Sequence, residues 1–279
     1  MKKGRLQDKV AIVTGSTQGI GEAVAHGYAR EGAKVIVCGR GAEKGERVTK
    51  SITDAGGTAH FIQFDLGDEQ SVVALVQKTV EHFGGLDIMV HNAHPTESTG
   101  GGTTNFAVKV DNFIGELTTD AIRKLTLPTF DGMIWVLREA INQFKKQGRG
   151  GRIITMSSMV SMQGLAGVDI HTATKGAMNA LTRSIAVEYA KDKIRCNTIV
   201  VGLVATAAIR SMEEDPVIGP ELAKCVLTDR IGRPEDYIGP AVFLASEEEA
   251  FFVTGQCINV DGGMGVIMPI PAIKPAEGA

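Results

Sequence analysis

The residues best suited to holding a phosphate group follow the first apolar run of the chain. Residues 14–21 read Thr-Gly-Ser-Thr-Gln-Gly-Ile-Gly and lead directly into a helical pattern. Glycines let the backbone turn tightly and approach a pyrophosphate, which then lies at the positive end of the helix. The turn therefore predicts a dinucleotide site formed by Gly15, Ser16, Thr17, Gln18, Gly19, Ile20 and Gly21.

The end of the next apolar run bears on which dinucleotide is bound. Enzymes that use NAD usually place an acid there, which binds the ribose 2′-hydroxyl and would repel a 2′-phosphate. This chain reads Cys38-Gly39-Arg40, with no acid and with a guanidinium that can pair with a phosphate. We therefore expect NADP(H), with NAD(H) as the alternative. In that alternative Arg40 is a solvated charge or stacks on adenine, and the uncharged Gln18 weakens the case for NADP(H).

Histidine and cysteine are the other residues whose spacing bears on chemistry. His91 and His94 follow a strand pattern, and His171 opens a helical one, so the three could meet near a pocket. His91 should point away from at least one neighbour on its strand, however, and no acid completes a ligand set, so we predict no metal. The four cysteines form no CxxC pair and are expected to be buried free thiols.

The elements that must position these residues alternate along the chain. Short β-branched runs predict strands at Val10–Thr14, Lys34–Cys38, His60–Phe64, Asp87–Val90, Arg152–Met156, Arg195–Val200 and Gln256–Val260. Amphipathic stretches predict helices at Ile20–Glu31, Ala42–Ala55, Glu69–His82, Thr119–Lys146 and Ile170–Ala190. This alternation, with near-continuously apolar strands, predicts a Rossmann-type doubly wound α/β fold: a seven-stranded parallel sheet with helices on both faces.

The chain shows no internal repeat and no interdomain linker. We therefore expect residues 1–279 to form a single dinucleotide-binding domain, with a core over about 7–264 and an extended tail over 265–279. Pro95–Glu116 is expected to be a loop beside the active site, and Val201–Pro220 a substrate lid. These segments and Ser161–Ile170 are mostly small or apolar, which favours a hydrophobic or cyclic substrate.

The composition argues against several classes of partner. The 279 residues are 43% hydrophobic and 22% charged, and the net charge is -3. That small acidic balance gives no reason to expect nucleic acid or an anionic membrane as a partner. The N-terminus lacks the apolar run of a signal peptide, and no apolar stretch is long enough to cross a bilayer. We therefore expect a cytoplasmic protein.

The spacing of Gly15, Gly19 and Gly21 resembles the first turn of the classical short-chain dehydrogenase/reductase family. Further motifs match in the family's order over about residues 7 to 264. The resemblance implies adenine contacts from Asp65 and Leu66, and cofactor contacts from the segment Asn92, Ala93 and His94, where the family reads NAG. It also implies a nicotinamide cradle that includes Val204 and Thr206, and a homo-oligomer, most simply a tetramer.

The same resemblance implies a catalytic set with a substitution at its centre. The family uses a serine, a tyrosine and a lysine, the last two four residues apart on one helical face, together with an asparagine on the preceding helix. Ser158 lies thirteen residues before position 171, which is the family's separation, and Lys175 matches the lysine. Position 171 is histidine, however, and Thr129 aligns with the asparagine. Two smaller departures are His94 for glycine and Val201 for proline.

An imidazole can take the place of a phenol in proton transfer. Its reference pKa is about 6.5 against about 10 for tyrosine, and a nearby Lys175 ammonium would lower it further. Neutral His171 therefore suits a base for alcohol oxidation better than an acid for ketone reduction. Our first hypothesis is an NADP(H)-dependent oxidoreductase that interconverts a secondary alcohol and a ketone through Ser158, His171 and Lys175.

Two other readings of the site stay open. The chain is alternatively an NADP(H)-binding protein of the same fold whose active site is degenerate or has been repurposed for regulation. It is alternatively a lyase- or hydratase-type enzyme that uses His171 and Ser158 without hydride transfer. The intact glycines, Asn92 and Lys175 favour dinucleotide binding, and so favour the first two readings over the third.

Overall fold

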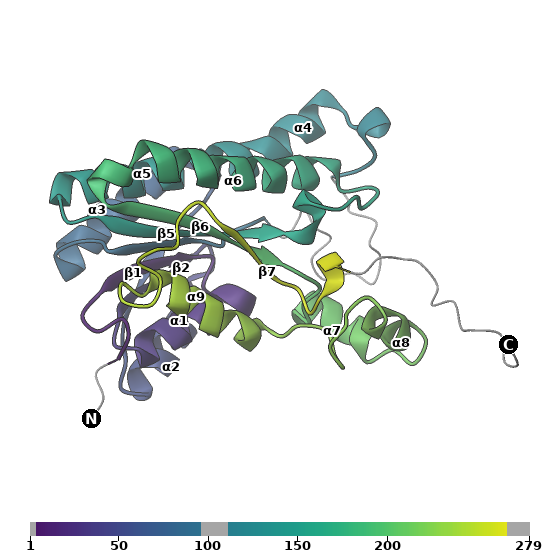
Figure 1. The fold of residues 1–279 in the computed structure, drawn as a ribbon, viewed down its shortest axis with the longest axis horizontal. Coiled ribbons are helices and arrows are strands. Elements are labelled where there is room, and N and C mark those ends of the chain that lie inside the picture. The colour runs from purple at the N-terminus through teal and green to yellow at the C-terminus, as the bar shows by residue number, and fades with distance from the viewer. Residues whose placement is uncertain (1–3, 96–110, 267–279) are drawn as a thin grey trace, which may run out of the picture.

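A single parallel sheet organises residues 4–95 and 111–266, the part of the chain that the computed structural model describes (Figure 1). Its seven strands are β1 (Val10–Thr14), β2 (Lys34–Gly39), β3 (Thr58–Gln63), β4 (Ile88–His91), β5 (Gly151–Ser158), β6 (Ile194–Val201) and β7 (Cys257–Val260). They pair in the order β3-β2-β1-β4-β5-β6-β7. The order reverses between β1 and β4, and in such sheets ligands bind at the carboxyl ends of the strands beside the reversal.

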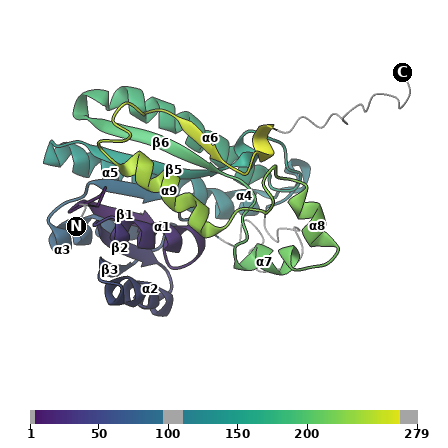
Figure 2. The ribbon, with the colours of Figure 1, turned by 60° about the horizontal axis from the view of Figure 1, so that its bottom comes forward.

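Helices cover both faces of this sheet, which confirms the predicted Rossmann-type architecture. One layer contains α1 (Gly19–Arg30), α2 (Ala42–Asp54) and α9 (Ile238–Ala245). The opposite layer contains α3 (Glu69–Phe83), α5 (Gly132–Gln147) and α6 (Asp169–Glu188). Three shorter helices, α4 (Thr119–Thr126), α7 (Ala207–Glu213) and α8 (Ile218–Ala223), lie toward one end of the molecule, where α7 and α8 pack together (Figure 2).

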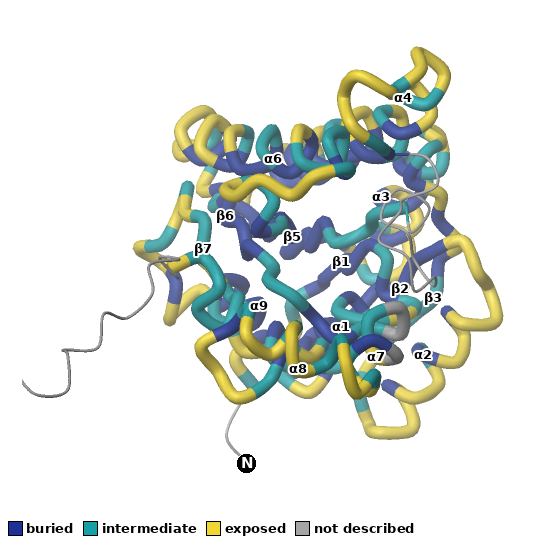
Figure 3. The backbone as a smooth tube through the Cα atoms, turned by 90° about the vertical axis from the view of Figure 1, so that its right-hand side faces the viewer, coloured by how far each residue is buried: buried dark blue, intermediate teal, exposed yellow. Residues whose placement is uncertain are grey.

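The alternation of side chains along each strand produces two apolar cores. In β1, Val13 joins the core beneath α1 and α9, whereas Ile12 joins the core beneath α3 and α5. In β2, Val37 likewise joins the core beneath α1 and α9, and Cys38 joins the core beneath α3 and α5. Because both faces are covered, the central strands are mostly apolar and run as a buried band between the helical layers (Figure 3).

The predicted helix Thr119–Lys146 is wrong as a single α-helix. A π-helical segment, Leu127–Asp131, separates α4 from α5. Pro128 lacks the N–H that a regular helix would need, and the Thr129 hydroxyl donates to the Leu125 carbonyl at 2.6 Å. The other predicted helices and strands are confirmed with small shifts at their ends. The largest shifts are two residues, at the start of β3, the end of β5 and the end of α6.

The structure tests only some of the expectations about the loops, the tail and the cysteines. Val201–Pro220 is partly helical, since it contains α7 and the start of α8. Most of Pro95–Glu116 and nearly all of the tail lie outside the described residues. Within the described residues, no helix combines the length and apolar character needed to span a bilayer. All four cysteines are free thiols, but only Cys38 and Cys196 are buried as expected, whereas Cys225 and Cys257 are partly exposed.

Candidate active site

The glycine turn between β1 and α1 is closed on one side and open on the other. Gly15 and Gly19 both have positive φ, +67° and +61°, which favours glycine at these positions. A Cβ on Gly21 would lie 2.4 Å from the Gly15 carbonyl oxygen, so the turn packs against its own helix there. A Cβ on Gly19 would meet nothing within 4 Å. The open backbone at Gly19, at the start of α1, fits the close approach of a pyrophosphate.

Asn92 ties this turn to the end of β4. Its Nδ2 donates to the carbonyl oxygens of Thr14 and Gly15 at 3.0 and 3.2 Å. In return, the Thr14 hydroxyl accepts the backbone N–H groups of Asn92 and Ala93 at 3.0 and 2.9 Å. Asn92 and Ala93 therefore fix the glycine turn at the point where the strand order reverses.

We expect Gly21→Ala to weaken NADPH binding while leaving the fold intact. The added methyl group would press on the Gly15 carbonyl and on the Asn92 amide, and such overpacking costs about 1–3 kcal/mol. Because the turn must move to relieve it, the dissociation constant for NADPH should rise by about 10-fold to 100-fold.

Fluorescence titration of NADPH into the two proteins measures that change, with thermal melting to check the fold. Gly239→Ala is the matched control, since Gly239 lies in α9, has no positive φ, and a Cβ there would meet nothing within 4 Å. An unchanged affinity in Gly21→Ala would show that the turn does not contact the dinucleotide.

Positive charge gathers at the end of β2. Ser16 holds the turn against β2, because its Oγ accepts the Cys38 N–H at 3.0 Å. Arg40 follows the strand and is exposed. Lys44, on the first turn of α2, donates its ammonium to Oε1 of Gln18 at 3.1 Å. The sequence analysis missed Lys44, although a basic residue on the helix after β2 was a readable signal.

The remaining predicted cofactor residues lie along the carboxyl edge of the sheet. Asp65 closes the loop after β3 by accepting the Gly67 N–H at 2.9 Å, and Leu66 is buried beside it. Val204 forms an isolated bridge with Gly232, and Thr206 directly precedes α7. No described contact tests their roles, so these stay predictions.

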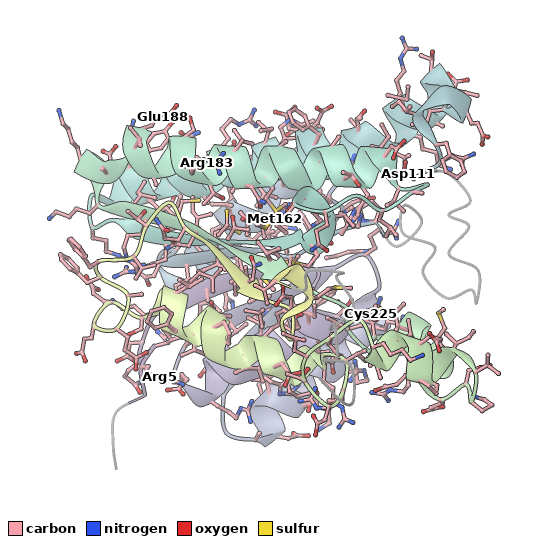
Figure 4. The ribbon with its side chains drawn as sticks, turned by 45° about the vertical axis from the view of Figure 1, so that its right-hand side comes forward. Arg5, Asp111, Met162, Arg183, Glu188 and Cys225 are labelled. Atoms are coloured by element: carbon pink, nitrogen blue, oxygen red, sulfur yellow. The ribbon has the colours of Figure 1, made fainter. Side chains whose placement is uncertain are left out.

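An acid outside α6 fixes the start of that helix. Asp111 is almost fully buried, and its two carboxylate oxygens accept the backbone N–H groups of Ile170 and His171 at 3.1 and 2.8 Å. The Asp169 carboxylate, on the first turn of α6, accepts the Ile114 N–H at 2.7 Å, which is a further bond between this segment and the helix. Figure 4 shows Asp111 at this end of α6. These bonds satisfy donors that a helix start leaves unpaired and set the position of the His171 backbone.

His171 and Lys175 lie one turn apart on α6, with the lysine more deeply buried. The Lys175 ammonium donates to the Met156 carbonyl oxygen at 2.7 Å, and burial lowers the pKa of Lys175 to about 8. Burial, and secondly the charge of Lys175, lower the pKa of His171 to about 3. Nδ1 of His171 lies 3.0 Å from Nε2 of His94. His171 is therefore neutral at pH 7 and hydrogen-bonded to a second imidazole.

His91 adds a third neutral imidazole near the same ammonium. It is 2% exposed, its Nδ1 has no hydrogen-bond partner, and burial and Lys175 lower its pKa to about 3. Burial also holds the pKa of His94 well below its usual value, with Lys175, His171 and His91 adding to the shift. No group of three or more histidine, cysteine or acidic residues in the described part of the chain is arranged to hold a metal ion.

Comparisons with known proteins identify the family of this chain. A family model described as enoyl-(acyl carrier protein) reductase matches residues 15–265. The chain belongs to the short-chain dehydrogenase/reductase family. It is 36% identical over 263 residues to an NADP-dependent (R)-specific alcohol dehydrogenase of Lentilactobacillus kefiri, which covers 93% of this chain and 97% of that protein.

Two solved structures of short-chain dehydrogenases are also similar. One is a putative NAD(P)-dependent gluconate 5-dehydrogenase of Beutenbergia cavernae with bound NADP: the TM-score is 0.80 at 33% identity, over 93% of this chain and 97% of that one. The other is a 7α-hydroxysteroid dehydrogenase with NADH and 7-oxo glycochenodeoxycholic acid. Its TM-score is 0.81 at 28% identity, over 93% of this chain and 95% of that one.

The two other members of the family's catalytic set lie near α6, and neither is hydrogen-bonded to His171 in the described part of the chain. Ser158 ends β5, and its Oγ accepts the Val160 N–H at 3.4 Å; in the described structure it makes no hydrogen bond to His171. Thr129 is buried, and its hydroxyl lies 3.3 Å from that of Thr174, the neighbour of Lys175. The π-helical segment thus brings Thr129 to the helix that carries the lysine.

Proposed function

We propose that this protein is an NADP(H)-dependent oxidoreductase that interconverts a secondary alcohol and a ketone, with a Ser-His-Lys site in place of the family's Ser-Tyr-Lys. The observation that carries the proposal is the pairing of His171 with His94 beside Lys175. Because Nδ1 of His171 is engaged by His94, its Nε2 is the nitrogen left for a substrate. A neutral imidazole held in this way can accept or donate one proton.

In the proposed reaction, His171, Ser158 and Lys175 have different roles. When bound, the nicotinamide accepts or supplies the hydride. Nε2 of His171 takes the hydroxyl proton of the alcohol, or returns a proton to the ketone oxygen in reduction. Ser158 orients that oxygen, and the Lys175 ammonium holds the cofactor ribose. Burial, and secondly the charge of Lys175, lower the pKa of His171 and so favour its neutral, basic form over the cation.

The preference for NADP(H) rests on the end of β2. Arg40 and Lys44 supply positive charge there, and the segment Cys38–Arg40 holds no acid that would repel a 2′-phosphate. Among the relatives, one is named NADP-dependent and one structure holds NADP, while another holds NADH. The relatives therefore support a nicotinamide dinucleotide, and the charges favour the phosphorylated form.

The substrate we propose is a hydrophobic or cyclic alcohol or ketone. Large apolar side chains lie exposed at the same edge of the sheet as the site, among them Met162 at 59% and Leu165 at 51%. Both follow β5 and precede α6, in one of the segments expected to line the pocket. The steroid named in one similar structure is a ligand of that kind.

The test of the proposed function is absorbance at 340 nm. Purified protein is mixed with NADP⁺ and a panel of secondary alcohols, or with NADPH and the matching ketones, including cyclic and steroidal members. We expect formation or consumption of NADPH with at least one apolar cyclic pair. A panel that gives no turnover in either direction, with NADP(H) or NAD(H), would refute the proposal.

We also propose that the chain is a single domain that assembles as a homotetramer. Val187 on α6 is 79% exposed, and Phe251 and Phe252 are 73% and 98% exposed. Large apolar side chains with this exposure are commonly covered in an oligomer. Light scattering at micromolar concentration should give about four times the chain mass of 29.5 kDa, and a mass near 29.5 kDa would contradict this prediction.

A further inference from the structure

The helix that carries His171 begins next to a residue that cannot cap it. α6 starts at Asp169, and Val168, in the N-cap position, makes no side-chain cap hydrogen bond. The first N–H groups of a helix have no intrahelical acceptor, and a polar N-cap side chain usually accepts from the second or third of them. In α6 these belong to Ile170 and His171. The start of this helix therefore needs an acceptor from another part of the chain.

Asp111 supplies that acceptor twice. Its carboxylate oxygens accept the N–H groups of Ile170 and His171 at 3.1 and 2.8 Å. The residue is 1% exposed and lies at the start of α6, where a carboxylate also interacts favourably with the helix dipole (Figure 4). A further bond runs the other way, because the Asp169 carboxylate accepts the Ile114 N–H at 2.7 Å. These three hydrogen bonds, which we call the α6 clasp, join the segment to the first turn of the helix.

The next turn of α6 is anchored to the sheet instead. The Lys175 ammonium donates to the Met156 carbonyl oxygen at 2.7 Å, and the Ser157 hydroxyl donates to the Lys175 carbonyl oxygen at 3.2 Å. Met156 and Ser157 both belong to β5, so these bonds do not pass through the clasp. The clasp therefore holds the turn that carries His171, and the sheet holds the turn that carries Lys175.

From this division we infer that Asp111 is a positioning residue for His171, which it places for proton transfer through the backbone N–H of that residue. The inference rests on the proposed function and adds a residue to it. In the proposed reaction the imidazole must reach the substrate oxygen while Lys175 stays at the cofactor ribose. Without the clasp the first turn of α6 is free to shift relative to the second, and a misplacement of about 1 Å can lower a rate by on the order of 10².

The clasp does not act by changing the charge of His171. Burial, and secondly the charge of Lys175, lower the pKa of His171 to about 3. The imidazole is therefore neutral throughout the assay range, with or without a carboxylate at the start of the helix. Substitution of Asp111 should lower kcat without changing the shape of its dependence on pH.

Variants at position 111 measure the positioning effect. Asp111→Ala should lower kcat at saturating cofactor by about 10-fold to 100-fold and leave the dissociation constant for NADPH unchanged. Asp111→Asn keeps one oxygen that can accept a hydrogen bond, so its kcat should lie between those of the wild type and Asp111→Ala. In the His171→Ala background, Asp111→Ala should lower the residual kcat by no more than about two-fold, because the side chain through which it acts is gone. An equal loss of kcat in both backgrounds would overturn the positioning role.

Asp68→Ala is the control for the loss of a helix cap. Asp68 caps α3 by accepting the Gln70 N–H at 3.0 Å, and α3 carries none of the proposed catalytic residues. The control variant should melt at a lower temperature and keep its kcat at saturating cofactor. If it lost as much kcat as Asp111→Ala, the loss at position 111 would reflect general stability, and the positioning role would again be overturned.

Hydrogen exchange tests the clasp without turnover. Mass spectrometry of the protein without cofactor compares peptides that cover the first turn of α6 with peptides that begin after Lys175. In Asp111→Ala the N–H groups of Ile170 and His171 should exchange about 10-fold faster, and the later turns should keep their protection. Unchanged exchange in the first turn, or faster exchange along the whole helix, would overturn the clasp even in an active enzyme. A wild type without turnover would instead refute the proposed function, and with it the catalytic role of Asp111.

Discussion

His171→Ala lowers the kcat of alcohol oxidation by on the order of 10² to 10⁴, which is the usual contribution of a positioned general base. The variant removes the imidazole that lies one turn from Lys175 on α6, which the proposed mechanism assigns to the substrate proton. It leaves the helix start intact, because Asp111 binds the backbone N–H of residue 171 and not its ring. Steady-state assays at saturating cofactor measure the change.

The pH dependence follows from the directions of the two pKa shifts. His171 is neutral above its pKa of about 3 and so remains a base throughout the range in which the protein can be assayed; its contribution is lost only as the pH falls toward 3. Lys175 keeps its ammonium below its pKa of about 8 and loses it as the pH rises through that value. We expect a kcat for oxidation without an acid limb near pH 6.5, and a KM for the cofactor that rises on the alkaline side.

His171→Tyr decides between the catalytic and the degenerate readings of the site. If His171 is the base, tyrosine makes the rate rise with pH, because a phenol has a reference pKa of about 10, and the larger ring lowers activity at pH 7. If the site is degenerate, the wild type is inactive and the tyrosine variant gains turnover, which would contradict our mechanism. His82→Ala is the control, since His82 stacks on His60 outside the site and its loss should leave kcat unchanged.

The fold could be predicted from the sequence because each strand and helix has its own local pattern of apolar residues, and these patterns alternate along the chain. Each central strand is an apolar run that needs cover on both faces, and each amphipathic helix supplies it. The π-helical segment Leu127–Asp131 escaped prediction because the apolar periodicity continues through it. One proline and one threonine hydroxyl change the hydrogen bonding without changing the pattern of apolar residues.

The site could be predicted only where its residues follow a linear motif. The glycine turn, Asn92 and Lys175 belong to such motifs, and the Asn92 amide donates to the Thr14 and Gly15 carbonyls of that turn. Asp111 acts on a helix that starts 58 residues later, and its segment shows only a loop composition. His94 and His171 were both noted as departures, but nothing in the spacing of residues 77 positions apart indicates that their rings meet.

Arg40→Asp should reverse the cofactor preference from NADPH to NADH. The wild-type guanidinium can pair with the 2′-phosphate, and charge-assisted hydrogen bonds of this kind contribute about 1.5–3 kcal/mol. Loss of that pairing weakens NADPH by about 10-fold to 100-fold, and the new carboxylate adds repulsion to the phosphate. The same carboxylate can accept a hydrogen bond from the 2′-hydroxyl of NADH.

Fluorescence titrations of both cofactors into both proteins measure this reversal as the ratio of two dissociation constants. Lys50→Gln is the control, because Lys50 lies farther along α2 and pairs with Asp54 at 2.8 Å, so the ratio should not change. Lys44→Gln should shift the ratio in the same direction as Arg40→Asp but by less, since Lys44 already donates to Gln18. The proposal would be contradicted by a wild type that binds both cofactors equally, or by an Arg40→Asp variant that still prefers NADPH. Either result would show that the charge at the end of β2 does not determine binding of the 2′-phosphate.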